Sequence, residues 1–154
     1  MRVSTITLLS LFACDGGGGS ETDLEAAFCA LLTDGPEEDV TATDDGSGPE
    51  LAIEDVAVEV TLLEDGDGMY WGVARYTADE AGSFAMGLSD DVPLKVIDAD
   101  GSVLPWENEV AGAGCAELAI RYTVALELAA YTIEFGPTDV DEVSFVSEES
   151  DDDL

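Results

Sequence analysis

The sequence predicts an all-β protein that folds as one antiparallel β-sandwich, jelly-roll or Ig-like, of about eight strands. Three observations predict this fold. Apolar and polar residues alternate with the period of two that a strand requires, most clearly over residues 118–128. Turn sequences rich in Gly, Pro and Asp separate the alternating segments. The chain has 154 residues and a hydrophobic fraction of 46%, which supports one buried core.

The N-terminal part of the predicted domain has the least regular pattern. The apolar residues of segment 24–32 share one face of a short helix, although a strand at 28–32 fits nearly as well. Residues 34–50 contain Gly-Pro and Asp-Gly pairs typical of turns, around a brief strand at 40–43. We therefore expect either a short helix or an additional strand before the regular β-structure.

The middle of the chain predicts two hairpins. The alternating segment 56–62 is followed by an acidic, Gly-rich turn and then by segment 69–77, which is rich in aromatic and β-branched residues. A strand at 84–88 comes next. Segment 94–98 then leads through an Asp-Gly turn into residues 102–104, which indicates the second hairpin.

Three further strands are predicted in the C-terminal part. Over residues 118–128 the large apolar side chains fall on one face of a strand, whereas a helix would scatter them around its circumference. Residues 131–135 continue the alternation, and Gly136-Pro137 is expected to end that strand. The last strand is expected at residues 143–146.

The beginning of the chain differs in composition from the rest. Residues 1–13 carry Arg2 and then an apolar stretch about half as long as a membrane-spanning helix needs. The run Leu11-Phe12-Ala13-Cys14, followed by an acidic, Gly-rich spacer, resembles the lipobox and tether of a bacterial lipoprotein. In that family cleavage before the Cys exposes an acylated N-terminus, which implies a lipid on Cys14. The alternative is a plain signal peptide in which Cys14 has no such role.

These patterns divide the chain into four parts. We expect a signal peptide at residues 1–13, a flexible acidic tether at 14–23, the sandwich domain at 24–146 and a disordered acidic tail at 147–154. The lipoprotein resemblance implies a location in the cell envelope, on the periplasmic side or the outer surface, with the membrane as a partner through the lipid on Cys14. The domain is expected to be monomeric.

The chain is strongly acidic. Asp and Glu number 36 against four Lys and Arg, which gives a net charge of −32. Nucleic acid is excluded as a partner, because phosphate binding needs basic residues that displace counterions. The acidic surface fits either adaptation to salt or a cationic partner. We expect a protein or carbohydrate partner whose identity the sequence does not specify.

The absence of His from the whole sequence restricts the chemistry. It excludes Ser-His-Asp and Cys-His nucleophile systems as well as His-ligated zinc or copper. An enzyme would have to use carboxylates alone, as retaining glycosidases do with a pair about 5 Å apart in a cleft. We therefore predict a non-enzymatic protein without a required cofactor, in an envelope structural, adhesion or ligand-binding role. A carboxylate-only hydrolase is the alternative.

Two cysteines lie in the predicted domain. Cys29 and Cys115 most simply pair with each other in an oxidising compartment. A closed loop of about 86 residues would stabilise the fold by on the order of 4.5 kcal/mol in the chain-entropy model. The alternative is a pair of buried free thiols.

Two of the predicted turns contain candidate calcium ligands. Asp65 and Asp67 in one turn, and Asp98 and Asp100 in the other, place carboxylates two residues apart, so that their oxygens can point at one calcium ion. Asp-Gly is also the commonest hairpin turn, and plain turns are therefore the alternative. Calcium is the one cofactor that the sequence suggests.

The strand predicted at 69–77 contains candidate ligand-binding aromatic residues. Tyr70 and Tyr76 lie on one face, and Trp71 and Arg75 on the other. If one face of this hairpin is exposed, Tyr70, Trp71 or Tyr76 could stack on sugar rings or anchor a partner. The alternative is that the rings fill core and edge positions.

Strand and turn patterns in the C-terminal half resemble a known family. The pieces are AGSFAM (81–86), VPLKVIDADG (92–101) and LELAAYTI (126–133). They resemble the β-sandwich modules of pre-peptidase C-terminal type that are appended to secreted bacterial proteins. The chain as a whole is similar to acidic envelope lipoproteins of myxobacterial type, which implies a compartment and no particular activity.

Overall fold

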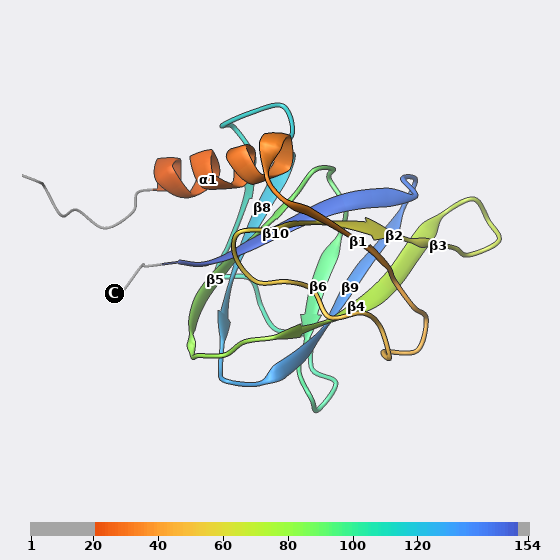
Figure 1. Cartoon of the computed structure of the whole chain (residues 1–154). Coiled ribbons are helices and arrows are strands. Elements are labelled where there is room, and N and C mark those ends of the chain that lie inside the picture. Colours follow the sequence, from red (N-terminus) through yellow and green to blue (C-terminus); the bar gives the residue numbers. More distant parts are fainter. Residues whose placement is uncertain (1–20, 151–154) are drawn as a thin grey trace, which may run out of the picture.

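The computed structural model describes residues 21–150 and confirms an all-β sandwich, with ten strands in two sheets and one helix (Figure 1). The elements are α1 (Glu21–Asp34), β1 (Glu37–Thr41), β2 (Ala57–Thr61), β3 (Leu63–Glu64), β4 (Tyr70–Thr77), β5 (Gly82–Leu88), β6 (Leu94–Ile97), β7 (Asn108–Ala111), β8 (Ile120–Leu126), β9 (Ala130–Thr138) and β10 (Glu142–Ser150). Strands β3 and β7 were not predicted, whereas the predicted strand at residues 102–104 forms only an isolated bridge.

The two sheets differ in size. Sheet A has the strand order β1-β2-β10-β5-β8-β7, and sheet B has the order β3-β4-β9-β6. Neighbouring strands are antiparallel except β1 and β2, which run parallel. The chain changes sheet between most successive strands, so that β4 pairs with β9 in sheet B while β5 pairs with β8 in sheet A.

The main core lies between the two sheets. Four buried rings meet edge to face in its centre, with centroid separations of 6.1–6.2 Å: Tyr76, Phe84, Phe135 and Phe145. The alternation predicted over residues 118–128 is confirmed along β8, whose even-numbered residues are buried. It fails at the end of the segment, because Leu128 lies in the β8–β9 turn and is 68% exposed.

A second, smaller core lies under α1, on the outer face of sheet A. The helix is confirmed, and the alternative strand at 28–32 is wrong. Phe28 is fully buried against β2, β5 and β10, where the outward residues are small or short: Ala57, Ala85, Gly87 and Val146. A sheet face of small residues lets the helix approach closely. Because α1 begins at Glu21, residues 21–23 belong to the helix and not to the predicted tether.

The first predicted hairpin is wrong in its pairing. Strand β2 lies in sheet A between β1 and β10, and only the two residues of β3 pair with β4 in sheet B. The crossing occurs at Leu62, whose N–H donates to the carbonyl of Asp141 at 2.8 Å. The period-two pattern reports which face is buried, and it carries no information about the neighbouring strand.

The second predicted hairpin is confirmed in a short form. Ile97 and Val103 form an antiparallel bridge, and the N–H of Asp98 donates to the carbonyl of Ser102 at 3.0 Å. The N–H of Leu104 donates to the carbonyl of Val96 at 2.8 Å. Residues 102–104 therefore cover the outer edge of β6.

Two predictions about the C-terminal part are wrong. Strand β9 continues through Gly136 and Pro137 to Thr138, with a register shift opposite Tyr70 and Gly72 that accommodates them. Gly136 has φ +91°, and a Cβ there would lie 2.5 Å from the carbonyl oxygen of Tyr70. Residues 147–150 are the end of β10 and not a disordered tail, because β5 supplies backbone partners from Ser83 to Met86. Residues 151–154 lie outside the described residues.

Candidate functional site: an acidic cluster at the edge of sheet A

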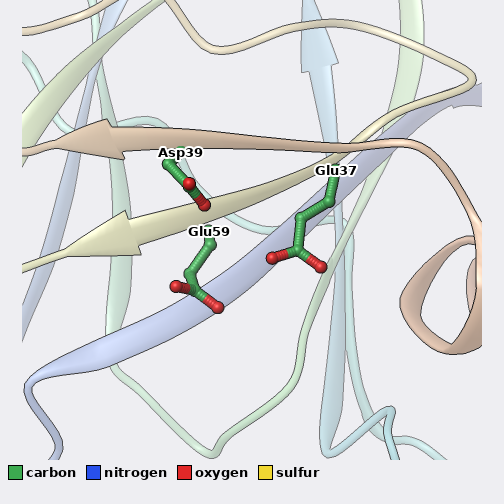
Figure 2. A group of neighbouring side chains, drawn as sticks. All are labelled: Glu37, Asp39 and Glu59. Atoms are coloured by element: carbon green, nitrogen blue, oxygen red, sulfur yellow. The ribbon is translucent and has the colours of Figure 1, made fainter.

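Three carboxylates gather on the outer face of sheet A, at its β1 edge. Asp39 on β1 lies directly opposite Glu59 on β2, and Glu37 lies two residues before Asp39 (Figure 2). One carboxylate oxygen of each residue lies within 4.8 Å of the others. We call Glu37, Asp39 and Glu59 the acidic cluster.

The strand pattern accounts for the position of the acidic cluster. Val58 and Val60 of β2 are fully buried in the main core, so that Glu59 between them must point outward. Val40 packs against the same core, and its neighbour Asp39 therefore points to the outer face. The parallel register of β1 and β2 places the outward residues of both strands side by side.

The electrostatics of the acidic cluster are unfavourable. Burial raises the pKa of Glu59 above its ordinary value of 4.5, and the negative charges of Glu142, Glu37 and Asp39 raise this pKa further. Like charges directly opposite each other across two strands destabilise a sheet. A positive charge beside the acidic cluster would therefore stabilise its ionised form.

The basic residues of the described part face other carboxylates. Arg75 pairs with Glu50 at 3.8 Å and Lys95 with Glu134 at 2.6 Å. The guanidinium of Arg121, buried beneath α1, lies 3.9 Å from a carboxylate oxygen of Glu25. These are all the Lys and Arg residues between residues 21 and 150, and each has its ion pair outside the acidic cluster.

The donor set of the acidic cluster suits a hard cation. Carboxylate oxygens are the ligands that calcium prefers, whereas zinc sites use His and Cys nitrogen and sulfur. Glu37 and Asp39 are exposed at the edge of a sheet. Their carboxylates are therefore accessible to an ion or ligand from solvent.

The acidic cluster was not predicted from the sequence. The spacing of Glu37 and Asp39 would have shown that they share a face once this segment was recognised as a strand. No sequence signal links them to Glu59, which parallel pairing brings beside Asp39 although the two residues are 20 positions apart in the sequence.

The predicted calcium residues cap their own turns. One oxygen of Asp65, Oδ1, accepts the N–H groups of Asp67 and Met69 at 2.8 and 3.3 Å. Within the second turn, Oδ1 of Asp98 accepts the N–H group of Asp100 at 2.9 Å and that of Ser102 at 2.9 Å. Between residues 21 and 150 these aspartates do not join any group of three carboxylates as close as the acidic cluster. Calcium binding by the turns remains a prediction.

The predicted aromatic residues separate into two environments. Tyr76 is completely buried, and its hydroxyl lies 3.2 Å from Oγ of Ser147, within hydrogen-bond distance. Its prediction as a surface ligand-binding residue is therefore wrong. Tyr70 and Trp71 are half-buried at the start of β4, where they pair with Glu64 and Leu63 of β3. Their ligand-binding role remains a prediction.

The disulfide between Cys29 and Cys115 is present and joins α1 to the β7–β8 loop. The Cα atoms lie 5.9 Å apart, and the bond spans 86 residues of sequence. The alternative of two free thiols is thus excluded.

Cys14 lies outside the described residues, and its lipidation remains a prediction. Between residues 21 and 150, no helix has the length and apolar character needed to cross a membrane.

Comparison with known proteins assigns no family. No protein-family model matches the chain, and no curated protein matches it in sequence.

Proposed function

We propose that this protein is a non-catalytic domain held in the bacterial cell envelope by a lipid on Cys14, with a structural, adhesion or ligand-binding role. The disulfide carries the proposal. It belongs to an oxidising compartment, and it uses both cysteines of the folded domain. Cys14 is then the one cysteine left for another chemistry, and it stands in the lipobox-like run Leu11-Phe12-Ala13-Cys14.

The shape and charge of the domain support an anchor at its N-terminal end. The start of α1 and the end of β10 lie on the same side of the molecule, and the β3–β4 turn lies on the opposite side (Figure 1). An anchor preceding α1 would leave the β3–β4 end facing away from the membrane. A protein of net charge −32 is repelled by anionic lipid, and stable attachment therefore requires a covalent anchor.

The test is fractionation of cells that produce the wild-type chain or Cys14→Ser, combined with metabolic labelling by an alkyne fatty acid. We expect the wild-type protein in the membrane fraction with label, and Cys14→Ser in the soluble fraction without label. The matched control is Cys29→Ser/Cys115→Ser, which keeps Cys14 and should retain the label. Membrane retention of unlabelled Cys14→Ser would reject the proposal.

Calcium-dependent binding is the second candidate function. It is favoured by the close carboxylates of the acidic cluster together with the Asp-rich turns. Calcium should raise the melting temperature at physiological salt more than magnesium does. Two double variants would show which carboxylates cause the rise in melting temperature: Asp65→Asn/Asp98→Asn and Glu37→Gln/Asp39→Asn. Equal effects of both metals in every variant would indicate counterion screening and no specific site.

A further inference from the structure

The edges of the two sheets are protected unequally. In sheet B, residues 102–104 return along β6, and a segment around Thr43 and Glu50 bridges to β4 beside the short β3. In sheet A the terminal strands are β1 and β7, and within residues 21–150 neither has a second strand neighbour. An open edge strand offers backbone N–H and C=O groups as a template for another strand.

The backbone of β1 is oriented for such pairing. Pro36 accepts from the N–H of Ala57, and the N–H of Ala42 donates to Thr61, both at 2.9 Å. In a parallel ladder alternate residues bond to the same neighbour. The even-numbered residues of β1 therefore face β2, and the odd-numbered residues Glu37, Asp39 and Thr41 direct their N–H and C=O groups toward the open edge.

The negative charge of the β1 side chains favours a basic partner. Glu37 and Asp39, which present their backbone at the edge, also carry the carboxylates of the acidic cluster on the outer face. Two copies pairing through β1 would bring these carboxylates together, so that the edge disfavours self-association. An added strand with Lys or Arg at alternate positions would instead supply the positive charge that no basic residue between 21 and 150 supplies there.

We propose that the open edge of β1 binds an extended, Lys- or Arg-rich segment of a partner protein as an added strand, whose alternate basic side chains lie beside Glu37, Asp39 and Glu59. Its remaining side chains then lie on the other face of the sheet, beside Glu38 and Val40. Strand addition combines backbone hydrogen bonds with recognition of alternate side chains. This interaction does not depend on the lipid anchor.

The probe is a seven-residue peptide of alternating Lys and Val, with blocked ends, added to the full chain carrying Cys14→Ser. Calorimetry should show saturable binding of one peptide per chain. Hydrogen exchange read by NMR should slow at the amides of Glu37, Asp39 and Thr41. Replacement of Glu37 by Gln with Asp39 by Asn should weaken binding about tenfold, because two charge pairs are lost. Glu109→Gln on the other open edge, β7, is the matched control and should leave the affinity unchanged.

A second peptide of the same sequence, with an N-methyl group on every backbone amide, keeps the charge but loses its backbone donors in either strand orientation and should bind at least about tenfold more weakly. Equal binding of both peptides would overturn the proposal in favour of charge attraction alone. Slow hydrogen exchange of the amides at residues 37, 39 and 41 without peptide would also overturn the proposal, since another segment of the chain would then cover the edge. A dimer in sedimentation that dissociates on peptide addition would assign the edge to a second copy and overturn the proposal as well.

Discussion

Phe28 of α1 lies directly over Gly87 of β5, so closely that a Cβ at residue 87 would come within 2.7 Å of Cδ2 of the Phe28 ring. The same Cβ would lie 2.9 Å from Cδ1 of Leu118 and 3.0 Å from Cγ2 of Val146. A side chain at residue 87 would therefore force its neighbours to shift. This contact holds the N-terminal helix of the described part against sheet A.

Gly87→Ala should destabilise the protein by about 1–3 kcal/mol, the usual cost of overpacking a buried site. The side chains around residue 87 come from α1, from β10 and from the loop before β8, and all three are buried in the small core. The decrease should appear as a lower midpoint of urea unfolding. In Gly87→Ala/Phe28→Leu the smaller side chain relieves the clash, so that the two free-energy losses should be less than additive. Full additivity would show that Phe28 and Gly87 are not coupled.

Removal of the disulfide should cost about 2–5 kcal/mol, because it releases the constraint on a long loop. Cys29→Ala/Cys115→Ala should therefore unfold at a clearly lower urea concentration than the oxidised wild type. Reduced wild-type protein should unfold at nearly the same concentration as this variant. If reduction leaves the midpoint of the wild type unchanged, the disulfide does not stabilise the domain.

Glu59→Gln should stabilise the protein at neutral pH by up to about 1 kcal/mol. The folded protein holds the pKa of Glu59 above 4.5, so that its ionised form is disfavoured in the fold. The stability gained from its neutral form is fully present below about pH 4.5 and is lost as the pH rises through the raised pKa of the folded protein. The benefit of the variant should consequently appear above about pH 4.5 and vanish near pH 3. Urea unfolding at both pH values measures it, and Glu109→Gln, outside the acidic cluster, should give no comparable gain.

Alkaline pH should unfold the protein through its buried tyrosines. Burial raises the pKa of Tyr76 and that of Tyr122 from 10.0 to about 12. An unfolded chain loses these protons near pH 10 while the folded protein keeps them, so that stability falls as pH rises from about 10 to 12. For Tyr76 the loss is at most about 3 kcal/mol. Unfolding midpoints at pH 9 and 11.5 would show it, and Tyr76→Phe should have a smaller alkaline loss than the wild type.

The core could be predicted because its information is local. Alternation places Ile120, Tyr122 and Val124 on one face whatever strand lies beside them, and the structure buries all three. The pairing of Cys29 with Cys115 followed from the expectation of an oxidising compartment and from the small number of cysteines. Both inferences needed only residue types and their spacing.

Strand partners and the acidic cluster could not be predicted, because they depend on contacts between distant segments. Strand β2 pairs with β10, which also buries apolar residues in the main core, and with β1, where Val40 packs against that core. A local hairpin would have satisfied the same pattern. The end of β10 folds because β5 offers it a ladder of backbone partners, which its acidic sequence does not reveal.

The sequence by itself therefore determined the fold class, the disulfide partners and the strong negative charge of this protein. Only the tertiary structure decided that Asp39 would face Glu59 and that β1 would be left at an open edge. The physical reason is that hydrophobic periodicity specifies which side of a strand is buried, whereas register and strand order are set by the packing of the whole core.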